Sequence, residues 1–386
     1  MEQQSYDLIV IGGGVLGTFH AYHALKLGKK VLQLEKDNFP VGSTVRNFGQ
    51  VVPSGMSGKW FQYGVRGLDI YQEIHQEFDL SVRCNGSVYI ASDEDEQTLL
   101  HELKNYYDTL GYTQQLLSKQ GIADKYPAIK DSYAKEALFF AQEVSVEPLV
   151  MIRRLQEYLQ VKFKNYTLRF DAPVIDCAVK GATAEVVLTN GDKLQAEKVI
   201  LCCGYEFKLL FKELFESSGQ IISKLQMMRT KPLKDIGLNG NILTGLTIRR
   251  YESFADNCPS FGKIATPSHY DELKKYGIHI LFKMAPDGSI IIGDSHEYAN
   301  GSRFDDLGFS LDSYINELML NEAERIVDFD VRQLATSWAG FYAQHADGIL
   351  EYNIDERIHI RTCIGGKGMT ASAGYAEASI ADIYHI

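Results

Sequence analysis

The hydrophobic positions of residues 6–36 predict a strand, a helix and a second strand in succession. Residues 8–11 form an apolar run without polar alternation, which is typical of a parallel strand covered on both faces. A glycine-rich turn follows, then a helical stretch that ends near residue 28 and a second strand at 31–34. This order predicts a βαβ unit at the start of the chain.

The turn between the first strand and the helix carries the spacing Gly12-x-Gly14-x-x-Gly17. We expect Gly12 to permit a tight turn, Gly14 to let the backbone approach a pyrophosphate, and Gly17 to let the helix pack closely on the strand. The start of the helix would offer free N–H groups and the positive end of its dipole to phosphates. Glu35 ends the second strand, where a carboxylate accepts hydrogen bonds from a ribose diol and repels the 2′-phosphate of NADP. The unit predicts a site for NAD or FAD, and a glycine-rich turn of another α/β protein would leave Glu35 unexplained.

The rest of the pattern interleaves two kinds of region. Helical spacing recurs at 60–78, 94–110, 118–125, 147–160 and 311–328. Strand patterns occur at 87–91, 167–170, 174–180, 183–189, 198–204, 224–230, 246–254, 277–284 and 289–295, with a two-residue hairpin turn at 287–288. We therefore expect an α/β chain (α+β overall) in which a Rossmann-like domain (1–80, 143–220 and 334–386) holds an inserted antiparallel-sheet domain (81–142 and 221–333).

Composition narrows the classes of protein. The 386 residues are 45% hydrophobic and 23% charged, as expected for a soluble globular protein with room for two domains. The net charge of −11 disfavours nucleic acid or an anionic membrane as partner. No apolar run approaches ~18 residues and the polar start lacks a signal-peptide pattern, so we expect no membrane span and a cytoplasmic location. The six cysteines show no CxxC pair or zinc-ligand spacing, which predicts buried thiols and no metal site.

Two further segments resemble cofactor loops: GSTVRNFG at 42–49 and GGKGMT at 365–370, the latter before a small-residue helix. A long FAD molecule requires such distant segments to converge on it. With them, the chain resembles the FAD-dependent oxidoreductases of the D-amino-acid oxidase, glycine oxidase and sarcosine oxidase family over essentially its whole length. The matching pieces, in family order, are IGGGVLG with Glu35, GSTVRN, Glu147-Pro148, Val174, VILCCG, DGSIIIGDS, Trp338-Ala339-Gly340, Asp347-Gly348 and GGKGMT.

The resemblance implies a Rossmann-like FAD-binding domain with an inserted antiparallel-sheet substrate domain. It also implies FAD contacts at Gly12, Gly14, Val15, Leu16, Gly17, Glu35, Lys36, Ser43, Thr44, Arg46, Asn47, Val174, Gly204, Gly340, Gly366, Lys367, Gly368, Met369 and Thr370. The last five would meet the flavin ring, where the helix dipole would stabilise a reduced, anionic flavin. No cysteine lies between Trp338 and Gly348, so we expect FAD to bind non-covalently.

Members of this family oxidise the C–N bond of a small amine by hydride transfer to flavin N5. Water then hydrolyses the imine, and O₂ or an electron carrier reoxidises the flavin. Tyr342 stands where glycine-oxidase-like members have a carboxylate-binding arginine, which puts a simple α-amino acid in doubt. Candidates for contact with the substrate or the reacting atoms are Gln50, Arg250, Tyr251, His279, Tyr342, His345 and Lys367.

The strings VRNFGQ, KLQMMRT, LTIRRYESF, YGIHIL and IGDSHEY resemble a branch of this family associated with phosphonate catabolism. The branch implies 2-aminoethylphosphonate derivatives, such as N-methylated forms, as substrates. The candidates for binding its anionic group include Arg249 and Arg250, which would face opposite sides of an alternating strand. The other cationic candidates are Lys224, Arg229 and His296. Three alternatives stay open: an oxidase of D-amino acids, glycine or sarcosine, an electron-carrier-linked dehydrogenase, and a flavin-binding protein without turnover.

Overall fold

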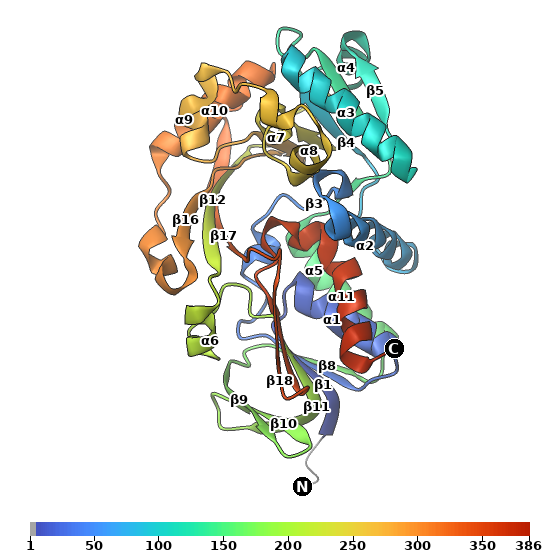
Figure 1. Cartoon of the computed structure of the whole chain (residues 1–386), viewed down its shortest axis with the longest axis vertical. Helices are drawn as coiled ribbons and strands as arrows, with labels where there is room; N and C mark the ends of the chain where they lie inside the picture. The colour runs from blue at the N-terminus through green and yellow to red at the C-terminus, as the bar shows by residue number, and fades with distance from the viewer. Residues whose placement is uncertain (1–4) are drawn as a thin grey trace.

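A buried parallel strand, β1 (Ser5–Ile11), organises the first of two large sheets in the computed structural model, which describes residues 5–386 (Figure 1). Leu8 and Val10 pack into one hydrophobic core, while Ile9 and Ile11 pack into another on the opposite face. This burial of both faces explains why the run has no polar alternation. The sheet has the order β18-β19-β11-β1-β2-β8, built from β18 (Leu350–Ile354), β19 (Ile358–Thr362), β11 (Lys193–Leu201), β2 (Val31–Leu34) and β8 (Tyr166–Arg169).

Helices cover one face of this sheet and bring the two ends of the chain together. α11 (Gly368–Tyr384) packs against both α1 (Val15–Lys26) and α2 (Gly58–Glu77), as Figure 1 shows. α5 (Pro148–Lys162) also contacts α1. An antiparallel extension of β9 (Val174–Lys180) and β10 (Thr183–Leu188) continues from β11, and α6 (Lys212–Ser217) follows.

The second sheet is mostly antiparallel and fills the other half of the molecule (Figure 1). Its order is β16-β12-β15-β14-β13-β4-β6-β5, with β17 paired to β12. The strands are β4 (Ser87–Ala91), β5 (Gln115–Ser118), β6 (Glu136–Phe140), β12 (Ile221–Thr230), β13 (Asn241–Leu243), β14 (Leu281–Met284), β15 (Ile290–Gly293), β16 (Glu297–Asn300) and β17 (Leu334–Gln344). Around it lie α3 (Glu94–Leu110), α4 (Lys119–Lys125), α7 (Gly245–Ile248), α8 (Glu252–Asn257), α9 (Asp271–Lys275) and α10 (Ser313–Ile326). A short ladder of β3 (Gln50–Val51) and β7 (Val144–Ser145) completes the strands.

The mixed α/β fold predicted from the sequence is confirmed, but residues 246–254 do not form the predicted strand. They form α7 and the start of α8, with helical hydrogen bonds from Ile248 N to Thr244 O and from Arg249 N to Gly245 O. The β-branched residues there favour a strand locally, and long-range contacts override that preference. The argument that Arg249 and Arg250 alternate across a sheet is therefore wrong.

Two other segments differ in detail from the sequence pattern. The predicted hairpin at 287–288 joins β14 and β15, but its loop is longer than two residues because β14 ends at Met284 and β15 begins at Ile290. Residues 334–344 pair along β12 in the second sheet. The sequence analysis had assigned them to the Rossmann-like domain, which contains the first sheet. The division into two domains remains a prediction, with β17 lying between them.

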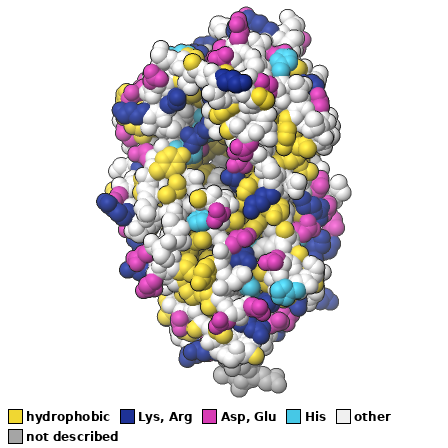
Figure 2. All heavy atoms as spheres, in the orientation of Figure 1, with side chains coloured by type: hydrophobic (Ala, Val, Ile, Leu, Met, Phe, Trp, Pro, Cys, Tyr) yellow, Lys and Arg dark blue, Asp and Glu magenta, His cyan; other side chains and the backbone are white. Residues whose placement is uncertain are grey.

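The charged side chains on the face drawn in Figure 2 are of mixed sign. Lys and Arg side chains alternate there with Asp and Glu, without a continuous basic area. None of the helices in the described part of the chain has the length and apolarity needed to cross a bilayer.

A buried carboxylate beneath the second sheet makes stability depend on pH. Glu143 accepts hydrogen bonds from Ser54 N (2.7 Å), Ser54 Oγ (3.0 Å) and Tyr112 Oη (3.0 Å), yet burial raises its pKa from 4.5 to about 7. The native state then holds a proton that the unfolded chain has lost, so the free energy of unfolding falls as pH rises from 4.5 to 7. We expect a contribution of about 3 kcal/mol to that fall. Urea unfolding at pH 5 and pH 8 measures this loss of unfolding free energy. Glu143→Gln should reduce the difference between the two pH values, while Glu157→Gln, at an exposed position, should preserve it. The same difference in the parent and both variants would contradict the assignment.

Candidate functional site

One cavity of about 610 Å³ connects the two sheets. At one end it is lined by the turn after β1 and by Glu35 at the end of β2. At the other end it is lined by Arg250, between α7 and α8, and by Asp294, just after β15. Residues far apart in the sequence therefore share one continuous space.

The glycine turn has the geometry that its spacing predicts. Gly12 has a φ of +117°, and a Cβ there would overlap the carbonyl of Cys202 on β11's C-terminal side. A Cβ on Gly17 would overlap the carbonyl oxygen of Gly12, so only glycine lets α1 pack this closely. Glu35 accepts hydrogen bonds from the N–H groups of Gly13 (2.8 Å) and Asp37 (3.1 Å), and burial raises its pKa. The carboxylate thus lies beside the glycine turn, at the position expected for a ribose contact.

The GSTVRN loop is fastened to the start of α1 and to β17. Thr44 Oγ accepts the N–H of Val15 at 3.0 Å, and Ser43 Oγ donates to Phe341 O at 2.5 Å. Asn47 holds the loop's 3₁₀ turn (Ser43–Val45) by donating to the carbonyls of Ser43 (3.0 Å) and Thr44 (2.8 Å). These bonds place the loop at the positive end of α1, where phosphates bind.

The residues present fit a long dinucleotide. The glycine cradle, which side chains would fill, lies at one end of the cavity. Further along, Gln50 lines the cavity and its buried Nε2 has no hydrogen-bond partner among the described residues. The start of α11 also opens on this part of the cavity through Gly366 to Thr370. A ligand with an acceptor beside Gln50 would satisfy this amide.

Most of the residues expected to contact the cofactor line this cavity. They are Gly12, Gly14, Val15, Leu16, Gly17, Glu35, Lys36, Ser43, Thr44, Asn47, Val174, Gly204, Gly366, Lys367, Gly368, Met369 and Thr370. Arg46 and Gly340 lie outside the lining, because Arg46 Nε donates to Val41 O (2.7 Å) and the Gly340 backbone lies against the Arg46 carbonyl. The GSTVRN loop thus packs closely on β17 at Gly340.

Candidates for substrate contact divide in the same way. Gln50, Arg250, Tyr251, His279, Tyr342 and Lys367 line the cavity. His345 does not, since its Nε2 lies 3.0 Å from the carbonyl of Ser218 and its Nδ1 accepts the N–H of Asp347 at 3.3 Å.

The other cations named from the sequence are also engaged elsewhere, apart from His296. Arg249 is paired with Glu96 (2.7 Å) and Asp93 (2.6 Å) on α3 and its cap. Arg229 is paired with Asp287 at 3.0 Å. Buried Lys224 donates to the carbonyls of Leu307 (2.9 Å) and Ser310 (2.6 Å).

Arg250 is the cation that remains available at the second-sheet end. Its guanidinium donates to Gly277 O (3.1 Å) and to Tyr298 Oη (2.9 Å), and the residue is exposed and lines the cavity. Tyr251 and Tyr342 also line this end, and burial raises the pKa of both phenols, so they stay protonated. A fork-shaped cation beside two O–H donors is suited to an anionic group.

Two histidines and one aspartate converge deeper in this end. His279 Nε2 lies 2.9 Å from Asp294 Oδ1 and 3.4 Å from His296 Nε2, and burial lowers the pKa of His279 to about 4. Asp294 was missed by the sequence analysis, although it directly follows an apolar strand run, a position that often carries functional polar residues. Glu252, which pairs with Lys367 at 3.1 Å across the cavity, was also missed.

Three of the six cysteines line the cavity, namely Cys202, Cys203 and Cys363. All six are unpaired thiols, and burial raises the pKa of Cys203 to about 12. Such thiols are weak nucleophiles.

Comparisons with known proteins agree with this geometry. Residues 7–381 match the family model described as "FAD dependent oxidoreductase". A D-amino acid dehydrogenase of Helicobacter pylori is 24% identical over 302 residues, which cover 63% of this chain and 72% of that protein. The structure of glycine oxidase from Geobacillus kaustophilus aligns with a TM-score of 0.77 at 16% identity, over 98% of this chain and 95% of that one. FAD-bound L-alpha-glycerophosphate oxidase from Mycoplasma pneumoniae aligns with a TM-score of 0.77 at 15% identity, over 98% and 95%.

Proposed function

This chain belongs to the FAD dependent oxidoreductase family, and from that premise we propose that it oxidises the C–N bond of a small amine that carries an anionic group. The observation that supports this proposal is the continuity of the cavity. Its glycine-lined end fits a dinucleotide, and its other end offers Arg250 within the same space. The name of the Helicobacter pylori relative, D-amino acid dehydrogenase, also agrees with a C–N donor.

The residues of this chain bind and orient the two reactants. Gly12, Gly14 and Glu35 would hold the adenosine and pyrophosphate part of FAD, and the start of α11 would hold the ring. Bound FAD supplies a two-electron acceptor for the hydride of the substrate's C–H bond. A neutral amine nitrogen donates its lone pair as that bond breaks, so positioning contributes more than a strong base, up to ~7–11 kcal/mol in favourable cases. The imine product then takes up water and splits into a carbonyl compound and an amine.

FAD is proposed to bind without a covalent bond. Of the thiols that line the cavity, Cys202 and Cys363 are buried and Cys203 is partly buried, and the raised pKa of Cys203 keeps it protonated. Reoxidation by O₂ or by an electron carrier completes the cycle. FAD should therefore separate from the polypeptide in denaturing electrophoresis, and a yellow protein band there would contradict this part.

For the substrate's anionic group we propose a phosphonate, as in N-methyl-2-aminoethylphosphonate. A phosphonate has three oxygens, and the donors at this end of the cavity are Arg250, Tyr251 and Tyr342, which together offer more than one bond. Tyr342 by itself cannot replace a guanidinium for a carboxylate. An α-amino acid, with its carboxylate on the reacting carbon, is the second candidate, supported by the names of the relatives.

Anaerobic reduction of the bound flavin tests the proposal. We expect N-methyl-2-aminoethylphosphonate to bleach the visible flavin absorption faster than glycine, sarcosine, D-alanine or glycerol 3-phosphate. Faster bleaching by an amino acid would overturn the proposal of a phosphonate substrate and would still support amine oxidation. Bleaching by glycerol 3-phosphate alone would overturn amine oxidation. Photoreduction without bleaching by any amine would identify a flavin-binding protein without turnover.

A further inference from the structure

We propose that His279, Asp294 and His296 bind one divalent transition-metal ion at the substrate end of the cavity. His279 lies just before β14, and Asp294 and His296 lie just after β15. The three side chains supply two imidazole nitrogens and one carboxylate oxygen to a common point. This donor set suits Zn²⁺, Co²⁺ and Fe²⁺.

The distances between the donor atoms match those around a metal ion. Nε2 of His279 and Nε2 of His296 are 3.4 Å apart, and Asp294 Oδ1 lies 2.9 Å from the first and 3.4 Å from the second. Ligands about 2.0–2.2 Å from a tetrahedral Zn²⁺ are roughly 3.3 Å from one another. The two rings are stacked, 11° from parallel with centroids 5.5 Å apart, so one ring has to turn about its Cβ–Cγ bond before both Nε2 lone pairs point at one ion. Small rotations of these side chains would complete the triangle.

The three side chains contact one another without a complete set of aligned hydrogen bonds. Asp294 is 6% exposed, and its Oδ1 lies 2.9 Å from His279 Nε2 and 3.4 Å from His296 Nε2 without a well-aligned hydrogen bond from the described residues. The two Nε2 atoms face each other at 3.4 Å, and the tautomer of each ring sets which of them carries a proton. When both rings carry their proton on Nδ1, three electron-pair donors face one another. A bound cation would satisfy all three at once.

Hydroxyl groups behind the rings orient them for this role. Nδ1 of His279 lies 3.2 Å from Thr247 Oγ1, and Nδ1 of His296 lies 2.9 Å from Ser223 Oγ. A hydroxyl that accepts the Nδ1 proton leaves Nε2 free to bind a metal. Histidine ligands in metal sites usually have such a partner.

The site would keep open coordination positions on the cavity side. All three residues line the cavity, and no fourth His, Cys, Asp or Glu ligand joins the cluster in residues 5–386. Three protein ligands leave room for water or substrate in the manner of reactive rather than structural zinc sites. With two neutral imidazoles and one carboxylate the site would carry a net charge of +1. It would thus attract an anionic oxygen group, and the identification of that group with the substrate's phosphonate rests on the proposed function.

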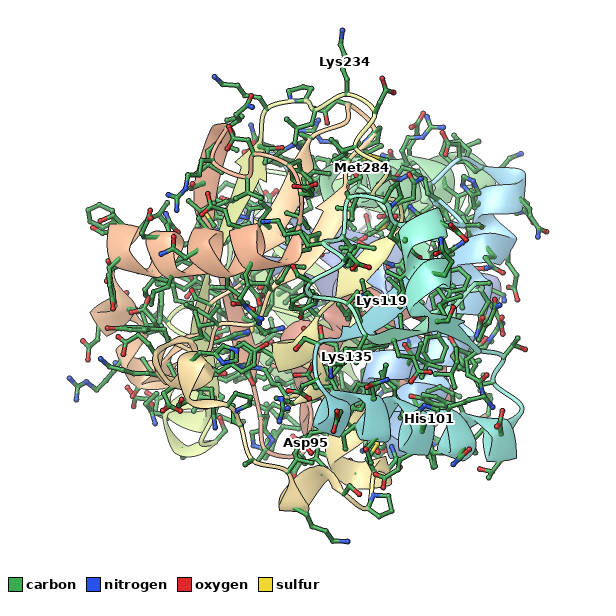
Figure 3. The ribbon with its side chains drawn as sticks, turned by 90° about the horizontal axis from the view of Figure 1, so that it is seen from above. Asp95, His101, Lys119, Lys135, Lys234 and Met284 are labelled. Atoms are coloured by element: carbon green, nitrogen blue, oxygen red, sulfur yellow. The ribbon has the colours of Figure 1, made fainter. Side chains whose placement is uncertain are left out.

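Cobalt binding tests the site without using activity. Untagged, flavin-loaded enzyme would be stripped with a chelator and titrated with Co²⁺, with bound metal measured by equilibrium dialysis and by the visible bands of tetrahedral Co²⁺. We expect one equivalent to bind, and Asp294→Asn and His296→Ala to weaken binding by about 100-fold or more. Thr247→Val, which removes only the orienting hydroxyl, should weaken it by about 10- to 100-fold. The control is His101→Gln, a surface histidine on α3 labelled in Figure 3, which should bind as the parent does.

Each outcome decides the proposal. Absence of stoichiometric binding, or equal binding by Asp294→Asn and the parent, would overturn it; flavin content and the thermal midpoint identify a variant that fails to fold. Addition of methylphosphonate should shift the Co²⁺ bands if the open positions face the cavity, and unchanged bands would overturn that placement. These measurements use no substrate turnover. The metal-binding result can therefore be interpreted even if amine oxidation fails, and amine oxidation can be tested even if no metal binds.

Discussion

Gly12→Ala is expected to purify with less than a tenth of the parent's bound FAD. The alanine would have to adopt a φ of +117°, a conformation that glycine alone adopts readily and that costs other residues about 1–3 kcal/mol. Its Cβ would also overlap the Cys202 carbonyl, so the turn must move away from β11. That shift carries the first N–H groups of α1 away from the pyrophosphate. The ratio of flavin absorption to protein concentration, with added FAD in a second titration, measures the loss.

Gly28→Ala is the matched control for backbone strain. Gly28 also has a positive φ, of +78°, but a Cβ there meets no atom within 4 Å. The control should lose only the stability that backbone strain costs, without the added overlap at Gly12, and keep its FAD. A Gly12→Ala protein with full FAD content would contradict the position assigned to the glycine turn. Equal FAD loss in both variants would assign the effect to strain alone.

The parts of the fold that the sequence predicted well are those encoded over short distances. The helix predicted at 94–110 matches α3, because Asp93 caps its start by accepting the N–H of Glu96 and Gly111 ends it with a φ of +66°. In the βαβ unit Gly17 likewise acts locally, since a Cβ there would overlap the carbonyl oxygen of Gly12, five residues earlier. Such elements need no information from the rest of the chain.

The segment 246–254 was predicted wrongly because its conformation depends on distant residues. Arg249 is nearly buried and its guanidinium pairs with Glu96 and Asp93, more than 150 positions earlier in the chain. A short helix brings it there, whereas local preferences for β-branched residues favour a strand. Periodicity within nine residues contains no sign of those partners.

The substrate end of the cavity was predicted only in part for a related reason. His279 and Asp294 are neighbours because the chain pairs Asp294 N with His279 O and His279 N with Asp294 O beyond the β14–β15 ladder. That register is fixed by the loop from 285 to 289, which the sequence pattern shortened to two residues. A different register would separate the imidazole from the carboxylate. The sequence analysis therefore named the histidines as separate candidates and did not predict that they lie together.

Arg250→Met is expected to reduce kcat/KM for the preferred anionic amine by roughly 10- to 150-fold, mainly through KM. Hydrogen bonds to a charged group contribute about 1.5–3 kcal/mol, and Arg250 is the guanidinium that lines the cavity. Its bonds to Gly277 O and Tyr298 Oη hold the fork in place before substrate binds. Arg250→Lys should recover only part of the loss, since an ammonium keeps the charge but not the fork.

A neutral amine separates anion binding from a general disturbance of the site. N-methylpropylamine lacks the anionic group, so its rate of flavin reduction should change little in Arg250→Met. Arg303→Met removes an equivalent charge from the surface, where Arg303 pairs with Asp306, and should leave both substrates unaffected. If Arg250→Met slows the neutral amine as much as the anionic one, Arg250 supports the shape of the cavity and the anion must be bound elsewhere. Retention of the parent's KM for the anionic amine would exclude Arg250 from substrate binding altogether.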